Sequence, residues 1–170
     1  MIYTEQLSKK IIDVANVMEN ARQIYILGSR SSFAIAYYMF FSLKRIKENI
    51  HLIENRNEDS SLNLQYISAE DLLIAISYPK YTEYTVHVLN FFKERGCKIV
   101  SITDRMTSPL AKNADYLLLV KNKLKIYFVT TITVINSLLL ALGKINPKLN
   151  IDTFQEENEV TRKLAVYCDD

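Results

Sequence analysis

The stretch Ile24-Tyr25-Ile26-Leu27-Gly28-Ser29-Arg30-Ser31-Ser32 decides the fold, because an unbroken apolar run passes directly into a loop rich in hydroxyl side chains. An apolar run without alternation is typical of a strand buried on both faces of a parallel sheet. A second stretch has the same design, with Leu72-Leu73-Ile74-Ala75-Ile76 followed by Ser77-Tyr78-Pro79-Lys80-Tyr81-Thr82. Each loop leads into a predicted helix, whose free N–H groups and dipole favour an anion. The two stretches therefore predict an anion site built from two strand-to-helix loops.

The rest of the chain alternates strands and helices. Hydrophobic spacing predicts strands at 23–27, 50–53, 72–77, 98–102 and 116–120. It predicts helices at 4–20, from Ser31 or Ser32 as the cap to the 44–47 turn, from Thr82 to the Gly96 cap, at 126–142 and at 153–167 after the Thr153–Glu156 capping box. It also predicts a brief helix or turn near 60–67 and a short helix that begins at Ser108 and Pro109. This order predicts a three-layer α/β domain with a five-stranded parallel sheet. Both hydroxyl loops should then share one pocket beyond the carboxyl ends of the strands.

Composition predicts one soluble domain over residues 1–170, with a lead-in helix at 4–20, a core at 21–145 and a C-terminal helix at 153–167. The chain is 49% hydrophobic and 24% charged, and its net charge of +2 is too small to indicate nucleic-acid binding by these residues. Its two cysteines, Cys97 and Cys168, lie too far apart to indicate a metal site or a disulfide framework.

The longest apolar tract, 126–142, raises the question of a membrane span. It is at the short end for a span and contains three threonines, an asparagine and a serine. We therefore expect a buried core or interface helix. The polar N-terminal stretch has no apolar signal-peptide core. The expected location is the cytoplasm, with no membrane partner.

Polar side chains of the two loops are the candidate ligand contacts. A serine at the start of the first helix can bind a phosphate or cap the helix, and Thr82 has the same two readings. Arg30 and Lys80 can add positive charge or remain solvated, and Pro79 removes one N–H from the second loop. The candidate residues are Arg30, Ser31, Ser32, Ser77, Lys80 and Thr82.

Catalytic and metal signals are weak. His51 and His87 have no carboxylate or cysteine at metal-ligand spacing, and no G-x-S-x-G nucleophile turn is present. His87 remains open as a general base, and Asp104 as a contact to sugar hydroxyls or a loop cap. We expect no metal, no cofactor and no catalytic residue.

Four stretches together resemble the SIS (sugar isomerase) domain, most closely the effector domain of RpiR-type transcriptional regulators. They are the two loops with their strands (24–36 and 71–82), the segment Phe92–Asp104 with its Gly96-Cys97-Lys98-Ile99-Val100-Ser101-Ile102-Thr103-Asp104 run, and Ser108-Pro109-Leu110-Ala111-Lys112-x-Ala114-Asp115. The resemblance covers residues 5–145 in element order. It implies a flavodoxin-like sheet, dimerisation, and a phosphorylated sugar bound at the strand carboxyl ends.

The resemblance also assigns roles to residues. By position, Ser32 and Ser77 contact the phosphate, with Ser31 and Thr82 beside it. The chain departs from the family pattern at three positions, because Arg30 and Lys80 stand where glycine is usual and Pro79 replaces a phosphate-binding serine.

The function implied is a non-catalytic phosphosugar sensor, the effector domain of an RpiR-type regulator of carbohydrate metabolism. The expected ligand is a phosphorylated sugar or amino sugar, and the expected assembly is a homodimer or higher oligomer. DNA contact would require a helix-turn-helix domain that these residues do not contain. The SIS-like domain itself is either part of a longer regulator or a stand-alone module. The alternatives are a sugar-phosphate aldose–ketose isomerase and a degenerate SIS dimerisation module.

Overall fold

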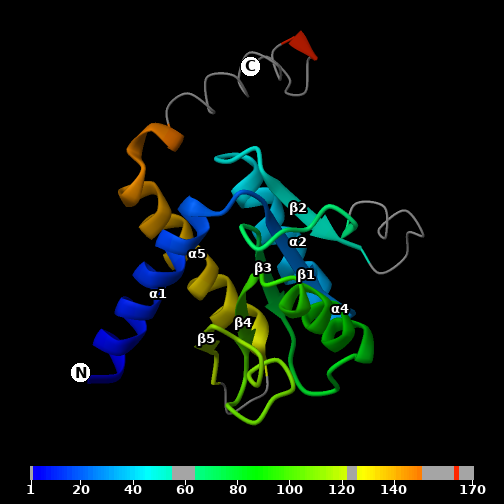
Figure 1. Cartoon of the computed structure of the whole chain (residues 1–170). Helices are drawn as coiled ribbons and strands as arrows, with labels where there is room; N and C mark the ends of the chain where they lie inside the picture. Colours follow the sequence, from blue (N-terminus) through cyan, green and yellow to red (C-terminus); the bar gives the residue numbers. More distant parts are fainter. Residues whose placement is uncertain (1, 55–63, 122–125, 151–162, 165–170) are drawn as a thin grey trace.

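A five-stranded parallel sheet forms the centre of the molecule, as predicted (Figure 1). The computed structural model describes residues 2–54, 64–121, 126–150 and 163–164. The sheet has the order β2-β1-β3-β4-β5, with β1 (Ile24–Gly28), β2 (Ile50–Ile53), β3 (Leu72–Ile76), β4 (Lys98–Thr103) and β5 (Tyr116–Leu119). This is the flavodoxin-like strand order.

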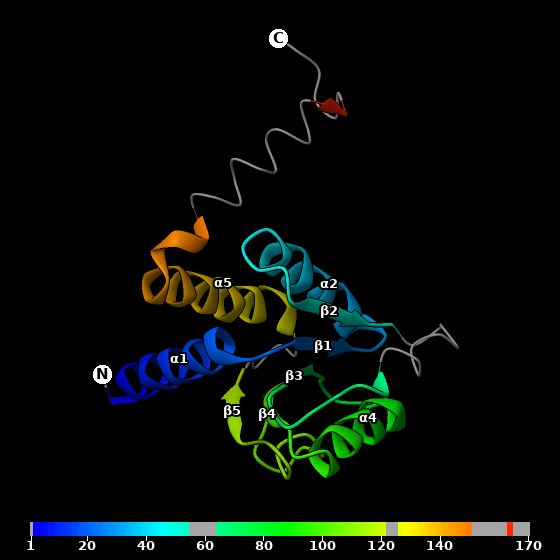
Figure 2. The same cartoon turned by 45° about the horizontal axis from the view of Figure 1, so that its top comes forward.

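Helices cover both faces of the sheet, which gives the three predicted layers. Figure 2 shows α1 (Ile2–Asn20), α2 (Ser31–Lys44) and α5 (Tyr127–Ile145) on one face and α4 (Glu83–Glu94) on the other. Alternate residues of β1 point to opposite faces, so that Ile24 and Ile26 pack with α1, α2 and α5 while Tyr25 and Leu27 pack with α4. The short helix η1 (Pro147–Asn150) follows α5.

Two local predictions are wrong. Neither Ser31 nor Ser32 caps α2, because Arg30 occupies the cap position and makes no side-chain cap bond. Backbone groups close this turn instead, with the N–H of Ser32 donating to Ser29 O at 3.1 Å. The segment from Ser108 is a series of turns rather than a helix.

Two other predicted segments fall wholly or partly outside the described residues. The helix at 153–167 lies outside them except for 163–164, and of the segment 60–67 only 64–67 is described, where it forms a turn. Elsewhere the predicted and observed boundaries agree to within three residues, and the strand at 50–53 is as predicted.

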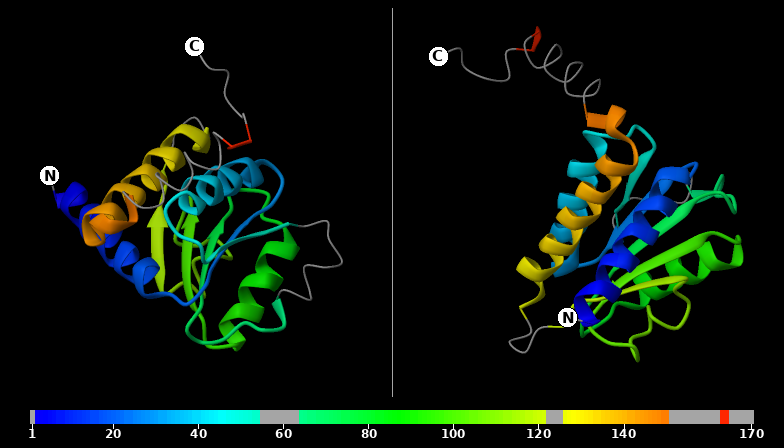
Figure 3. Two further views of the ribbon diagram at one scale, coloured as in Figure 1. Left: turned by 90° about the horizontal axis from the view of Figure 1, so that it is seen from above. Right: turned by 90° about the vertical axis from the view of Figure 1, so that its left-hand side faces the viewer.

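Helix α5 has the length and composition of a membrane span, but its inner side belongs to the core. Val134, Ile135 and Leu138 pack with the sheet, and the helix lies beside α1 (Figure 3). Only 28% of its apolar stretch is buried, and Leu140 is 71% exposed. The predicted core helix is therefore present, and it also carries an outward apolar face.

Candidate functional site

The two hydroxyl loops lie side by side at the carboxyl edge of the sheet. Strands β1 and β3 are neighbours, and Gly28 at the end of β1 is opposite Ile76 at the end of β3. The chain leaves β1 toward α2 on one face and leaves β3 toward α4 on the other. Such a switch point opens a crevice between adjacent loops, where α/β proteins bind their ligands.

The first loop is a tight turn that requires an unusual backbone. A Cβ added to Gly28 would lie 2.5 Å from Ser32 O and 2.8 Å from Ala36 Cβ, so α2 can sit on the end of β1 only because residue 28 is glycine. Arg30 has φ 55° and ψ −122°, and Ser32 N–H closes the turn onto Ser29 O. These are the dihedrals of the first central position of a type II′ turn, which normally requires glycine.

The second loop has the same feature at Lys80, where φ is 75°. Within the described residues, Arg30 and Lys80 are the two non-glycine residues with positive φ. These are the two positions at which the sequence resemblance implies glycine, and both hold a side chain at a φ that glycine adopts without strain. Thr82 then caps α4 by accepting from the Thr85 N–H at 3.4 Å, which confirms the predicted cap.

A chain of three hydroxyls joins the loops. Ser29 Oγ lies 2.9 Å from Thr85 Oγ1, which in turn lies 2.7 Å from Thr82 Oγ1. Sequence reasoning singled out neither Ser29 nor Thr85. The Thr82-x-x-Thr85 spacing, which places both hydroxyls on one turn of a helix, was the available signal.

Ser32 and Ser77 present hydroxyls without a partner. The two residues are 4% and 6% exposed, and neither hydroxyl has a hydrogen bond within the described part of the chain. The N–H groups of both residues are engaged, that of Ser77 with Ile102 O at 3.2 Å. The buried unpartnered side-chain atom of the described residues is Asp71 Oδ1, so the two serine oxygens remain open to solvent. Each hydroxyl is therefore available to a ligand.

The remaining predicted contacts surround these serines. Ser31, Arg30 and Lys80 are exposed and Thr82 is half-buried. Arg30 and Lys80 have no ion-pair partner in the described residues, so both charges are available at the edge. All six predicted residues therefore lie on the two loops or at the helix starts that follow them.

Aromatic residues close the two sides of the edge. On one side the Tyr81 O–H donates to Asp104 Oδ1, and Arg105 Nε donates to Asp104 Oδ2 at 2.9 Å. Burial and this bond raise the pKa of Tyr81. On the other side Tyr78 stacks on Tyr127, with parallel rings 4.2 Å apart.

Neither histidine belongs to this edge. His51 lies within β2, where Nε2 is 2.7 Å from Gln23 Oε1 and burial lowers its pKa. His87 is exposed on α4. Among the described residues no three His, Cys, Asp or Glu side chains are grouped to hold a metal ion.

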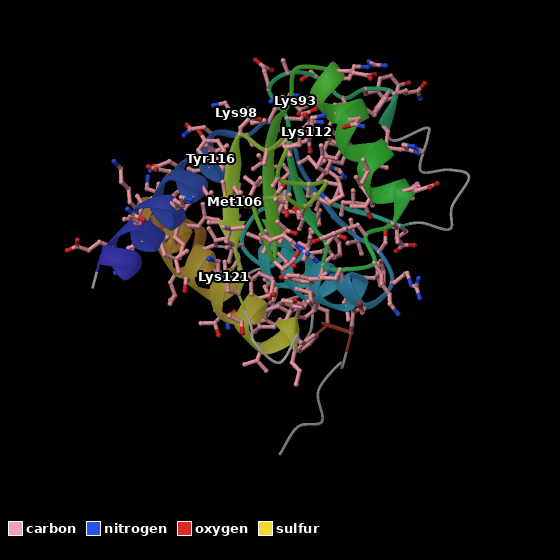
Figure 4. The ribbon with its side chains drawn as sticks, turned by 90° about the horizontal axis from the view of Figure 1, so that it is seen from below. Lys93, Lys98, Met106, Lys112, Tyr116 and Lys121 are labelled. Atoms are coloured by element: carbon pink, nitrogen blue, oxygen red, sulfur yellow. The ribbon has the colours of Figure 1, made fainter. Side chains whose placement is uncertain are left out.

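A cavity of about 730 Å³ lies at the opposite end of the sheet. It is lined by α1 and by the amino ends of β3, β4 and β5, including Lys98 and Tyr116. Figure 4 shows these two residues near one another, with Lys121 beyond the other end of β5. An ion pair of 2.6 Å between Arg22 and Asp71 crosses its floor. Neither hydroxyl loop borders this cavity.

The sequence of the chain is similar to that of a curated protein. An uncharacterized HTH-type transcriptional regulator of Haemophilus influenzae is 29% identical over 115 residues, which are 68% of this chain and 40% of that protein. The chain thus spans less than half of that relative.

Two solved structures share the fold. The sugar isomerase domain of an RpiR transcription factor from Sphaerobacter thermophilus has a TM-score of 0.81 at 23% identity, covering 89% of this chain and 86% of that one. NanR of Vibrio vulnificus, solved with ManNAc-6P, has a TM-score of 0.80 at 21% identity, covering 92% and 62%. The SIS domain pattern matches residues 17–143. The chain therefore belongs to the SIS domain family.

Proposed function

We propose that this SIS domain binds a phosphorylated sugar or amino sugar at the carboxyl ends of β1 and β3. The observation that carries the proposal is the pair of nearly buried, unpartnered hydroxyls of Ser32 and Ser77 on adjacent loops. Hydroxyls beside helix N-termini suit a phosphate. The structural relative NanR, solved with ManNAc-6P, supports this ligand class.

The four other predicted residues complete the phosphate contacts in this proposal. Ser31 and Thr82 lie beside the serines, and Arg30 and Lys80 supply charge from positions where glycine is usual. Pro79 has no N–H, so the second loop offers fewer backbone donors. Side-chain cations then replace part of the usual backbone contact, and charge-assisted hydrogen bonds of this kind are the stronger type.

The proposed role is that of a non-catalytic sensor in a transcriptional regulator of carbohydrate metabolism. The relative from Haemophilus influenzae, an HTH-type regulator of which the chain spans 40%, supports this role. DNA contact in such a regulator would belong to a separate helix-turn-helix domain. The described start of α5 is apolar at Ile126 and Tyr127, and Asp104 is held by Tyr81 and Arg105, so the described residues of this edge offer no evident base for an isomerase.

We further propose a cytoplasmic homodimer that pairs through the outer face of α5. Residues 127–143 contain no charged side chain, although Val129 and Leu140 are mostly exposed. Grooves of about 460 Å³ and 440 Å³ border Leu140 on either side. A ridge flanked by two grooves suits packing against a second copy. Leu140→Arg should halve the mass measured by sedimentation, whereas Tyr66→Arg, away from this face, should not.

Thermal unfolding with a panel of sugar phosphates tests the ligand. At 100 times Kd a ligand stabilises by about 2.7 kcal/mol, which raises Tm by about 5–11 °C in a domain of this size. Ser77→Ala should weaken this shift, and Ser137→Ala on α5 should not. The absence of a shift with every hexose, pentose and amino-sugar phosphate would refute phosphosugar binding. Deuterium uptake at sugar C2 in heavy water would instead show an isomerase.

A further inference from the structure

The buried threonine between the two loops has a role that the ligand contacts alone do not explain. We propose that Thr85 is a positioning residue, which locks the first loop to the second and turns the Thr82 hydroxyl proton toward the bound phosphate. This inference rests on the proposed phosphosugar function.

Thr85 is placed to act on both loops at once. It is fully buried in the first turn of α4, and its hydroxyl is within hydrogen-bond distance of Ser29 and of Thr82. Ser29 belongs to the turn that contains Arg30, and Thr82 belongs to the loop that contains Lys80. The side-chain hydroxyl of Thr85 therefore connects the two loops independently of the sheet.

The three hydroxyl protons allow the hydrogen bonds between Ser29, Thr85 and Thr82 to run in either of two directions, and a bound anion selects one of them. Three hydroxyls have three protons, and two of these form the bonds along the chain. If the bonds run from Ser29 to Thr85 to Thr82, the Thr82 oxygen accepts from the Thr85 hydroxyl and from the Thr85 N–H, and its own proton is free. If the bonds run in the reverse direction, the Thr82 hydroxyl donates its proton to Thr85 and has none left for a ligand.

A phosphate selects the first direction, because its ionised oxygens accept protons and do not donate them. Hydrogen bonds in such a chain also polarise one another, so each strengthens the next. Thr82 then donates to the ligand from a fixed position. The same bonds hold Ser29, and with it the turn that carries Arg30 and Ser32.

Three variants separate this role from a purely structural one. Thr85→Val keeps the shape of the side chain but removes the hydroxyl, and Thr85→Ser restores the hydroxyl. Ser101→Ala is the matched control, because Ser101 is another buried hydroxyl, bonded to Leu110 O at 3.0 Å and absent from both loops. Affinity is measured by calorimetry with ManNAc-6P and with inorganic phosphate.

We expect Thr85→Val to weaken ManNAc-6P binding by roughly tenfold or more, since the Thr82 hydroxyl is then no longer held in the direction in which it donates to the charged phosphate. Thr85→Ser should stay within about threefold of the original protein, and Ser101→Ala should bind with unchanged affinity although it is less stable. Equal affinity of Thr85→Val and the original protein would overturn the positioning role, and so would an equal loss in Ser101→Ala.

A ligand-free measurement keeps this inference distinct from the proposed function. A double-mutant cycle of unfolding with Ser29→Ala and Thr85→Val should show coupling between the two sites, because they share a hydrogen bond. Additive effects would overturn the lock between the loops, whatever the ligand. If the unaltered protein binds neither probe nor any other sugar phosphate, the proposed function fails, and the ligand-directing part of the inference fails with it.

Discussion

Replacing Arg30 by glycine should make the protein more stable and its ligand affinity weaker. Arg30 holds φ 55° and ψ −122°, a conformation that side chains with a Cβ rarely adopt. The strain costs about 1–3 kcal/mol in the folded state, and glycine removes it. Glycine also loses about 0.5–1 kcal/mol through its greater freedom in the unfolded chain. Arg30 is exposed without a partner among the described residues, so no packing is lost.

With mid-range values of about 2 kcal/mol for the strain and about 0.75 kcal/mol for the freedom of glycine, the net stabilisation expected for Arg30→Gly is about 1.25 kcal/mol, or a Tm higher by about 2–5 °C in a domain of this size. Urea unfolding measures the free energy, and the m-value should stay unchanged because the exposed surface is unchanged. Ser31→Gly is the control, since the neighbouring position is helical and glycine there should cost about 0.5–1 kcal/mol. An Arg30→Gly protein no more stable than the original would refute the strain argument. Unchanged sugar-phosphate affinity would separately refute a role for the guanidinium in binding.

Three further predictions concern packing and charge. Gly28→Ala should destabilise by about 1–3 kcal/mol in urea unfolding, because its Cβ would lie 2.5 Å from the Ser32 carbonyl oxygen; a neutral effect would mean that α2 can shift. Burial raises the pKa of Glu19, but hydrogen bonds led by Lys47 outweigh it and lower the pKa below its usual value of 4.5. The Glu19 carboxylate contributes its full stability above pH 4.5, and this contribution is lost as the pH falls below that value. Glu19→Gln should therefore reduce the loss of unfolding free energy between neutral and acid pH. An unchanged pH dependence of the unfolding free energy would exclude Glu19 as a source of acid sensitivity. Burial raises the pKa of Cys97 to about 11. In a variant without the other cysteine, the Cys97 thiol should therefore react with a disulfide reagent at pH 8 only as fast as the protein opens. A rapid reaction would contradict the burial of this thiol.

The strands were predictable because each is a short apolar run followed by a loop residue. A run such as Leu72–Ile76 is buried along its whole length, so its pattern depends little on its neighbours. The start of α2 was not predictable in the same way. A serine at a helix start suggests a cap, but here the backbone carbonyl of Ser29 accepts from the Ser32 N–H and leaves the hydroxyl free.

The candidate site likewise contains residues that could be predicted from the sequence and a contact that could not. Ser32, Ser77 and Thr82 could be named from sequence because each follows a strand or starts a helix. The bond between Ser29 and Thr85 could not, because the two residues are 56 positions apart and meet only when β1 and β3 pair. Changes at Arg30 and Lys80 suggested an altered pocket floor, whereas the structure shows that the backbone there still adopts positive φ.

The pairing of β1 between β2 and β3 has a consequence for synthesis on the ribosome. The unit β1–α2–β2, which contains the turn around Arg30, emerges before β3 and Thr85. Because β3 pairs on the open side of β1, the two loops lie side by side only when β3 has docked there. A ligand that contacts both loops, as proposed, would therefore bind only chains in which β3 has already paired with β1. Its binding would then stabilise the pairing of β1 with β3 against local opening.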